Sequence, residues 1–195
     1  MSTAKRADEN EKDSVRKRLF IVVDLPDPVV DEVTRIQKEL ASHSLFKGRF
    51  TKPLNLHLTM KFLGEVSTGG VEPIRAALRD VSLPPFEAAL GELGVFSGHG
   101  QIRIVWIHIA GEPIVGLQRR VDSALSPAFE PERRFMSHLT IARVKSIADR
   151  RRLLQTVDGF VMPSLEFAVT EFKLKRSVLS SAGPTHTDID TYPLV

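Results

Sequence analysis

The alternation of apolar and polar residues predicts two closely similar strands in this chain. One begins at His57 and reads His-Leu-Thr-Met, and the other begins at His138 and reads His-Leu-Thr-Ile. Successive side chains of a β-strand point to opposite faces. Each strand is therefore predicted to carry a histidine and a threonine (Thr59 or Thr140) on one face and to bury the two apolar side chains that alternate with them.

The remaining hydrophobic pattern predicts that one order of elements occurs twice. Apolar runs of strand type alternate with apolar stripes near the 3.6-residue period of a helix. In the first half the order is strand 18–25, helix 28–41, His-Leu-Thr strand from residue 54, helix 71–81 and strand 86–90. In the second half it is strand 102–110, helix 113–125, His-Leu-Thr strand from residue 138, helix 147–157 and strand 165–169.

The last strand of each half supports this repeat in detail. Apolar residues occupy positions 86, 88, 90, 93 and 95 in the first copy and 165, 167, 169, 172 and 174 in the second, with an offset of 79 throughout. The alternation changes phase after Leu90 and after Val169, which predicts a β-bulge at the same place in both strands. The repeat predicts two lobes related by a pseudo-two-fold axis, with the His-Leu-Thr strands facing each other across a groove.

The composition is that of one globular domain. Of the 195 residues 42% are hydrophobic, which is enough for a sizeable core. We expect residues 1–17 to form a disordered charged tail and residues 18–195 to form a single domain of two lobes.

The absence of cysteine excludes disulfides, thiolate metal sites and a cysteine nucleophile, and it fits a cytoplasmic protein. No apolar run is long enough to cross a membrane. The net charge of +3 is compatible with a phosphate-bearing partner but too small to indicate nucleic acid by itself.

Two histidines and two threonines around one point suit acid–base chemistry at phosphorus. Histidine titrates near neutral pH, so a neutral imidazole can take one proton while a charged imidazole gives another, and a bell-shaped pH dependence follows. Threonine hydroxyls can hold phosphate oxygens during in-line displacement. A strained cyclic phosphate needs less help, so a metal ion can be dispensed with. The chain shows neither a P-loop glycine pattern nor the His-x-x-x-His helix of a zinc site.

The motifs in their context resemble a known family. Besides the two His-Leu-Thr runs, segments 18–26, 57–66 and 179–184 are similar to those of the RNA 2′,3′-cyclic phosphodiesterases. These enzymes, also called 2′-5′ RNA ligases, belong to the two-histidine (2H) phosphoesterase superfamily. The resemblance covers about residues 18–195. It implies an α+β fold, a bilobal and pseudo-two-fold duplicated domain in which two antiparallel β-sheets flank a central cleft and the helices lie outside.

The resemblance also implies a role for each motif residue. His57 would be the proton donor to the departing ribose 3′ oxygen, and His138 the proton acceptor that activates water. Thr59 and Thr140 would bind the phosphate. Arg143 would be a further substrate-binding residue, although a twist or bulge is needed to bring it to the motif face of the strand.

The implied substrate is RNA with a 2′,3′-cyclic phosphate end, for which tRNA fragments are one source, and the product is a 2′-phosphate end. With an RNA 5′-hydroxyl as nucleophile, the reverse reaction would form a 2′-5′ linkage without ATP. No metal or other cofactor is expected. Two other functions stay open: a 2H-fold phosphodiesterase for small cyclic nucleotides or 2′-5′ oligonucleotides, and a non-catalytic protein that binds RNA ends. We expect a monomer, because the pseudo-symmetry already supplies two halves.

Two positions depart from the family pattern. Ser137 stands where proline usually precedes the second histidine, and His186 stands where tyrosine is usual. Neither is expected to contact the four motif side chains. Trp106 and Phe20 are interpreted as core residues rather than base-stacking platforms. The cations that flank the motif strands either line an RNA path or form a solvated surface; they are Arg49, Lys52, Lys145, Lys173, Lys175 and Arg176.

Overall fold

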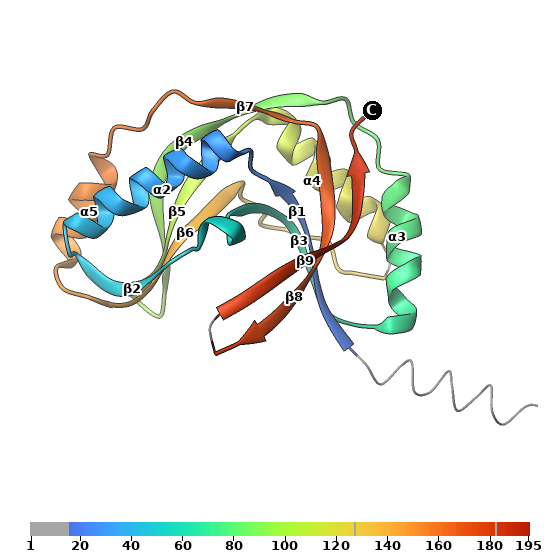
Figure 1. The fold of residues 1–195 in the computed structure, drawn as a ribbon, viewed down its shortest axis with the longest axis horizontal. Coiled ribbons are helices and arrows are strands. Elements are labelled where there is room, and N and C mark those ends of the chain that lie inside the picture. The colour runs from blue at the N-terminus through green and yellow to red at the C-terminus, as the bar shows by residue number, and fades with distance from the viewer. Residues whose placement is uncertain (1–15, 127, 182) are drawn as a thin grey trace, which may run out of the picture.

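The computed structural model describes residues 16–126, 128–181 and 183–195, which form an α+β fold. This part of the chain contains four α-helices and nine strands, and the strands form two antiparallel sheets (Figure 1). The first half contains β1 (Arg16–Asp24), α2 (Asp27–Ser42), β2 (Phe46–Phe50), the 3₁₀ turn η1 (Pro53–Asn55), β3 (His57–Ser67), the 3₁₀ turn η2 (Thr68–Gly70), α3 (Val71–Arg79) and β4 (Phe86–Gly98). The second half contains β5 (Gln101–Ala110), α4 (Glu112–Leu125), β6 (His138–Ile147), α5 (Arg150–Asp158), β7 (Glu166–Val169), β8 (Glu171–Ser180) and β9 (Gly183–Pro193).

The expected fold class and repeated element order are confirmed. The predicted helices are found within a few residues of their expected bounds. Helix α5 begins at Arg150 rather than near residue 147, because β6 extends to Ile147 and the Asp149 carboxylate then caps the helix by accepting from the Arg152 N–H at 2.9 Å. Of the expected tail at 1–17, residues 1–15 lie outside the described residues, and residues 16 and 17 belong to β1.

The two sheets exchange strands between the halves of the sequence. One sheet has the order β3-β1-β8-β9 and the other has the order β2-β6-β5-β4-β7. The pair β3–β1 from the first half corresponds to the pair β6–β5 from the second. Strand β4 of the first half joins the sheet of the second half, where it pairs with β5, and β8 of the second half joins the sheet of the first half, where it pairs with β1. Each sheet is therefore completed by a strand from the other repeat.

The pseudo-two-fold axis passes between β4 and β7. The beginning of β4 pairs antiparallel with β7, and Ala88 lies opposite Phe167. These two residues are also related by the repeat offset of 79, so this pair maps onto itself. The expected bulge is present in β4 as a register shift between Leu90 and Leu93. In the second copy, the change of phase after Val169 marks the point where the chain leaves β7 and enters β8 in the other sheet.

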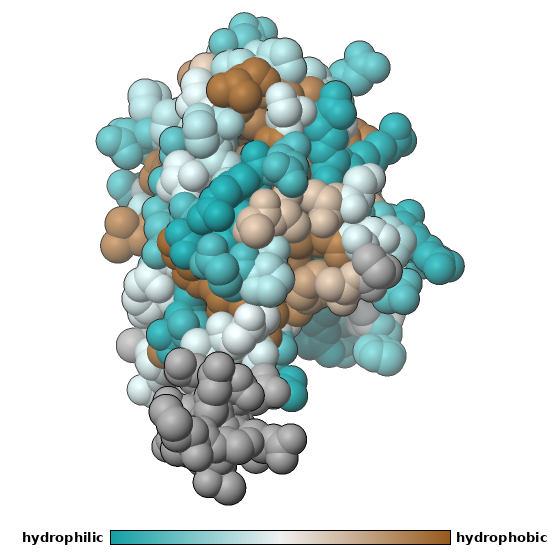
Figure 2. Space-filling view, turned by 90° about the vertical axis from the view of Figure 1, so that its right-hand side faces the viewer, coloured by the Kyte–Doolittle hydropathy of each residue, from teal (hydrophilic) through white to brown (hydrophobic). Residues whose placement is uncertain are grey.

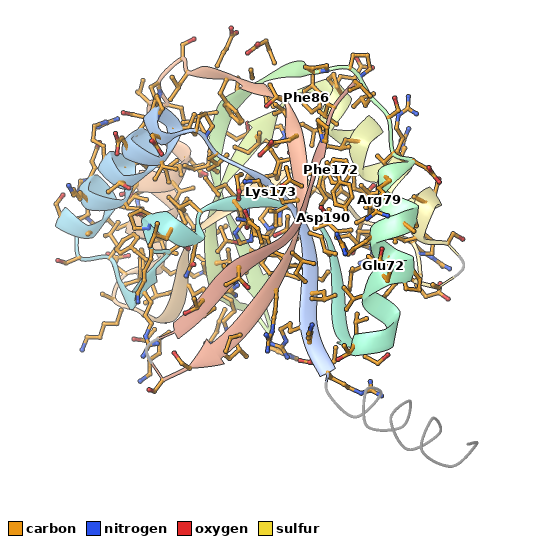
Figure 3. The ribbon with its side chains drawn as sticks, turned by 45° about the vertical axis from the view of Figure 1, so that its right-hand side comes forward. Glu72, Arg79, Phe86, Phe172, Lys173 and Asp190 are labelled. Carbon is orange, nitrogen blue, oxygen red and sulfur yellow. The ribbon has the colours of Figure 1, made fainter. Side chains whose placement is uncertain are left out.

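The helices cover the outer faces of the two sheets. Helices α2 and α5 contact the sheet of β6 and β4, whereas α3 and α4 contact the sheet of β3 and β9 (Figure 1). The side of the molecule that carries α3 shows hydrophilic side chains with hydrophobic ones between them (Figure 2). Ion pairs attach α3 to β9, because Asp190 accepts from the Arg75 guanidinium at 2.9 Å, with Arg79 at 4.0 Å (Figure 3). Within the described residues, no helix is long and apolar enough to span a membrane.

A buried ion pair joins β3 to α4. The Lys61 ammonium lies 2.5 Å from the Asp122 carboxylate and 2.6 Å from the carbonyl oxygen of Glu130. Asp122 also accepts from Gln118 at 2.6 Å and from the backbone N–H of Glu132 at 2.9 Å. Burial alone would raise the pKa of Asp122, but the hydrogen bonds, that of Lys61 foremost, lower it below its ordinary value. Lys61 therefore connects the first motif strand to the segment that leads into the second.

Replacing Lys61 with methionine is expected to lower the free energy of unfolding by about 3–5 kcal/mol, because Asp122 is then left buried without its counter-charge. Adding Asp122→Asn to this variant is expected to recover part of the loss. Urea denaturation followed by circular dichroism measures both values. A loss below about 1 kcal/mol for Lys61→Met, which is the range of exposed ion pairs, would contradict a structural role for this pair.

Candidate active site

The two motif strands have the same burial pattern. The first nine residues of β3 and of β6 agree position by position in being buried, half-buried or exposed. The side chains that alternate with the histidines and threonines are buried in the core; they are Leu58, Met60, Leu139 and Ile141. His57, Thr59, His138 and Thr140 are all half-buried on the opposite face. The predicted alternation is therefore confirmed, and both histidine residues are partly accessible to solvent.

Both motif strands carry a bulge immediately after the threonine. In the β5–β6 pairing Thr140 lies opposite Trp106 and Ala142 lies opposite Val105, so Ile141 is an extra residue. The β1–β3 pairing skips Met60 in the same way. Because the extra residue changes the phase of the alternation, Ala142 is buried and Arg143 is exposed, as His138 and Thr140 partly are. The bulge that Arg143 required is thus present.

His57 is surrounded by groups from three other strands. Its ring centroid lies 5.2 Å from that of Phe20 in β1 and 5.4 Å from that of His186 in β9. Burial, followed by the nearby positive charges of His186 and Lys175, lowers the pKa of His57 to about 4, although Asp24 and the Asn55 backbone act in the opposite direction. In the free protein this imidazole is therefore neutral at neutral pH.

His138 has a defined tautomer. Its Nδ1–H donates to the carbonyl oxygen of Met136 at 2.8 Å, because a carbonyl group can only accept. In the neutral ring Nε2 therefore carries no hydrogen, and its free lone pair can accept a proton. The ring makes a T-shaped contact with that of Phe96 in β4, at a centroid distance of 4.9 Å and an interplanar angle of 84°. His138 is therefore held in an orientation that suits a general base.

The motif strands belong to different sheets and contact each other in the middle of the molecule (Figure 1). Each carries its histidine at its first residue, and each is the neighbour of an equivalent strand, β1 or β5. Over residues 16–126, 128–181 and 183–195, no group of three or more histidine, aspartate or glutamate side chains is arranged to hold a metal ion. The motif residues of these two strands offer imidazoles and hydroxyls, and Arg143 adds a guanidinium.

Two of the flanking lysines belong to an ion-pair network beside His57. Lys175 lies 2.9 Å from both Asp24 and Asp188, and Lys173 lies 3.1 Å from Asp24 and 3.3 Å from Asp188. Burial would lower the pKa of Lys173 (Figure 3), but the carboxylates of Asp24 and Asp188 raise it. Both lysines are largely covered and already paired. They therefore stabilise this side of the sheet. Asp24, which pairs with both lysines and lies opposite His57, was not singled out from the sequence.

Known proteins are similar to this chain over nearly its whole length. The sequence model of the LigT-like phosphoesterases matches residues 23–106 and 109–186. The RNA 2′,3′-cyclic phosphodiesterase of Methanothermobacter thermautotrophicus is 36% identical over 185 residues, which is 92% of this chain and 100% of that protein. The protein of the same name from Archaeoglobus fulgidus is 34% identical over 181 residues, covering 90% and 99%. The chain belongs to the LigT-like phosphoesterase family.

Solved structures of similar proteins have the same fold. A protein from Thermus thermophilus is 28% identical and superposes with a TM-score of 0.78 over 91% of this chain and 97% of that one. Escherichia coli LigT in its apo form is 23% identical, with a TM-score of 0.75 over 93% and 99%. The second segment matched by the family model begins within β5, where the second repeat of this chain begins.

The two departures from the family pattern differ in their consequences. The expectation that His186 lies away from the motif side chains is wrong, because its ring contacts both His57 and Phe20. The sequence carried no signal for this contact, since β9 was not predicted as a strand. Ser137 is buried, and its carbonyl oxygen accepts from the Ile109 N–H at 3.2 Å, so the start of β6 is held by its neighbour β5.

Trp106 and Phe20 are buried, as the sequence predicted, with 8% and 3% of their surface exposed. Phe20 nevertheless contacts the site, because its ring lies against His57. Trp106 packs on Phe96 at 5.2 Å and lies against Gly94, where any larger residue would collide with the indole ring. Each motif histidine thus has a phenylalanine ring at its side.

The pKa of His57 is expected to rise when His186 is replaced with glutamine, because a neighbouring positive charge is removed while a polar side chain of similar size remains. NMR of the histidine rings during a pH titration measures this value. Since the folded pKa lies below the unfolded one, the contribution of His57 to stability is present above about pH 6.5 and decreases toward pH 4. An unchanged or lower pKa in the variant would contradict the coupling.

Proposed function

We propose that this chain hydrolyses the 2′,3′-cyclic phosphate end of RNA to a 2′-phosphate end. The observation that carries the proposal is the pair of matched strands, each with a half-buried histidine and threonine on one face and the same bulge behind them. Further support comes from family membership and from relatives named RNA 2′,3′-cyclic phosphodiesterase at up to 36% identity.

In the proposed reaction water attacks phosphorus while the bond from phosphorus to the ribose 3′ oxygen breaks. His138 accepts the proton of the attacking water through Nε2, and His57 donates a proton to the departing 3′ oxygen. The hydroxyls of Thr59 and Thr140 and the guanidinium of Arg143 hold the non-bridging oxygens. The reaction leaves His138 charged and His57 neutral, and proton exchange with solvent restores the starting state. The imidazoles supply both proton transfers, so the mechanism is proposed to be metal-independent.

The low pKa of His57 is compatible with its role as proton donor once substrate is present. In the free protein the ring is neutral, because burial foremost, and then the neighbouring His186 and Lys175, disfavour its charged form. The negative charge of a bound phosphodiester favours the imidazolium, so substrate binding raises the pKa of His57. Proton uptake by His57 is therefore coupled to substrate binding. The rate is expected to follow a bell-shaped pH profile.

The same displacement permits ligation. An RNA 5′-hydroxyl in place of water would attack the cyclic phosphate and form a 2′-5′ linkage without ATP, because the strained ester supplies the driving force. We place this chemistry in the cytoplasm, in keeping with a sequence without cysteine, and we propose that the protein acts as a monomer.

Replacing His57 or His138 with alanine is expected to lower the rate of hydrolysis about 10²–10⁴-fold, because each variant lacks one proton-transfer group. The assay uses an RNA oligonucleotide with a 2′,3′-cyclic phosphate end in the presence of EDTA, with identification of the 2′-phosphate product. His43→Ala, at the end of α2, is the control and should retain full activity. Wild-type binding without turnover would favour the RNA-end-binding alternative. Turnover of cyclic mononucleotides alone would favour the small-nucleotide alternative.

Replacing Arg143 with alanine is expected to raise KM about 10–100-fold, since one charge-assisted hydrogen bond to a phosphate is worth about 1.5–3 kcal/mol. Lysine at this position should restore only part of the affinity, because it lacks the planar fork of the guanidinium. Arg151→Ala, on the exposed side of α5, is the matched control. Equal KM values for the three variants and the wild type would remove Arg143 from the site.

A further inference from the structure

Two arginines lie opposite each other on the motif face of the second sheet. Strand β2 is the edge strand of this sheet and pairs antiparallel with β6 (Figure 1). In that pairing Arg49 lies directly opposite Arg143, and both are exposed. Opposite residues of an antiparallel pair share a face, so Arg49 lies on the face that carries His138 and Thr140. Like charges in this position destabilise a sheet, so the pair favours the binding of an anion.

The position of β2 against β6 is fixed by a buried glutamine. Gln37 of α2 is 6% exposed, and its side-chain amide donates to the carbonyl oxygens of Thr51 and Ile141 at 2.9 Å each. Ile141 is the bulge residue of β6. The N–H and the hydroxyl of Thr51 donate to the carbonyl oxygens of Ile141 and Thr140, at 2.9 and 2.7 Å. These hydrogen bonds hold the end of β2 at the bulge and keep the two arginines opposite each other.

The positive charge of this strand pair is not neutralised by the protein. In the part of the chain that the structure describes, no acidic side chain pairs with either arginine. The other side of the site differs, because the two lysines of β8 near His57 are already paired with carboxylates. Strands β2 and β6 contain no aspartate or glutamate, and their cations are Lys47, Arg49, Arg143 and Lys145.

The end of an RNA strand offers a second anion beside the reactive one. The cyclic phosphate carries a single negative charge, which the proposed role of Arg143 already matches. The phosphodiester that joins the last nucleotide to the one before it carries the next charge. The Cβ atoms of directly opposite residues lie about 4.5–5.5 Å apart, and the long arginine side chains can spread further. Two guanidiniums in this arrangement match two neighbouring phosphates of one strand.

We propose that Arg49 binds the phosphodiester that precedes the cyclic phosphate of the substrate RNA. The proposal rests on the proposed function, because it takes Arg143 to hold the cyclic phosphate. A guanidinium suits this task because its planar fork can bind two phosphate oxygens at once. Arg49 thus favours RNA ends over a cyclic mononucleotide, which lacks the preceding phosphodiester. It also directs the RNA strand toward β2 rather than toward the paired lysines of β8.

The test measures KM of Arg49→Ala with two substrates. One is a dinucleotide with a 2′,3′-cyclic phosphate end, and the other is a 2′,3′-cyclic mononucleotide with a 5′-hydroxyl. KM is expected to rise about 10–100-fold for the dinucleotide, since one charge-assisted hydrogen bond is lost, and to stay unchanged for the mononucleotide. Arg119→Ala, on the exposed side of α4, is the matched control and should change neither value. An unchanged KM for the dinucleotide, or an equal rise for both substrates, would overturn the proposal.

A neutral linkage tests the same contact from the side of the RNA. A dinucleotide whose phosphodiester is replaced by an uncharged methylphosphonate should bind the wild type as weakly as the natural dinucleotide binds Arg49→Ala. The variant should not distinguish the two dinucleotides. Arg49→Ala is not expected to lower the midpoint of thermal unfolding, because it removes a like-charge neighbour. A lower midpoint with no discrimination between the linkages in the wild type would assign Arg49 a structural role and contradict the proposal.

A binding measurement separates this proposal from the proposed function. Fluorescence anisotropy with 2′-phosphate-ended RNA reports affinity without turnover. In Arg49→Ala the slope of log Kd against log salt concentration is expected to decrease by about 0.7, the value for one phosphate contact to a single strand. This decrease in a protein that shows no hydrolysis would support the phosphate contact and remove the activity. Normal hydrolysis with an unchanged slope and affinity in Arg49→Ala would remove the contact alone.

Discussion

The buried charge pair between Lys61 and Asp122 is the constraint that relates the two motif strands to each other. Lys61 follows the motif of β3, and its ammonium group reaches across to α4 and to the backbone of Glu130. Asp122 in turn fixes the N–H of Glu132, in the segment that leads to His138. Isolated charges are very costly to bury, so neither partner has a stable alternative position in the interior. This contact thus links the strand that begins at His57 to the segment that leads to His138.

The face in front of this contact is built by repetition with small differences. Equivalent bulges after Thr59 and Thr140 bring Phe62 and Arg143 onto the strand face that carries the motif histidines. The differences then assign unlike properties to the two sides. Burial, His186 and Lys175 lower the pKa of His57 and keep its ring neutral. His138 instead donates from Nδ1–H to a backbone carbonyl oxygen. A symmetric scaffold therefore places two equivalent imidazoles in unlike environments.

Much of this arrangement follows from local patterns, and the rest does not. The alternation in β3 and β6, the repeat and the phase slip at Leu90 are properties of neighbouring residues, so they were predicted from the sequence. Strand β9 was missed because its polar run lacks apolar alternation and is stabilised by pairing with β8. The contact of His186 with His57 depends on that long-range pairing. The burial of Lys61 also could not be predicted, since only the distant Asp122 makes it favourable.

The exchange of β4 and β8 between the sheets has a consequence for how the chain can be divided. A fragment ending before β5 would leave β4 without the strands on either side of it, and its own sheet would lack β8 and β9. Such a fragment exposes unpaired edges that favour aggregation. Two copies of one half could satisfy those edges only by lending strands to each other, as domain-swapped dimers do. In the present chain both halves belong to one polypeptide, so their association does not depend on protein concentration.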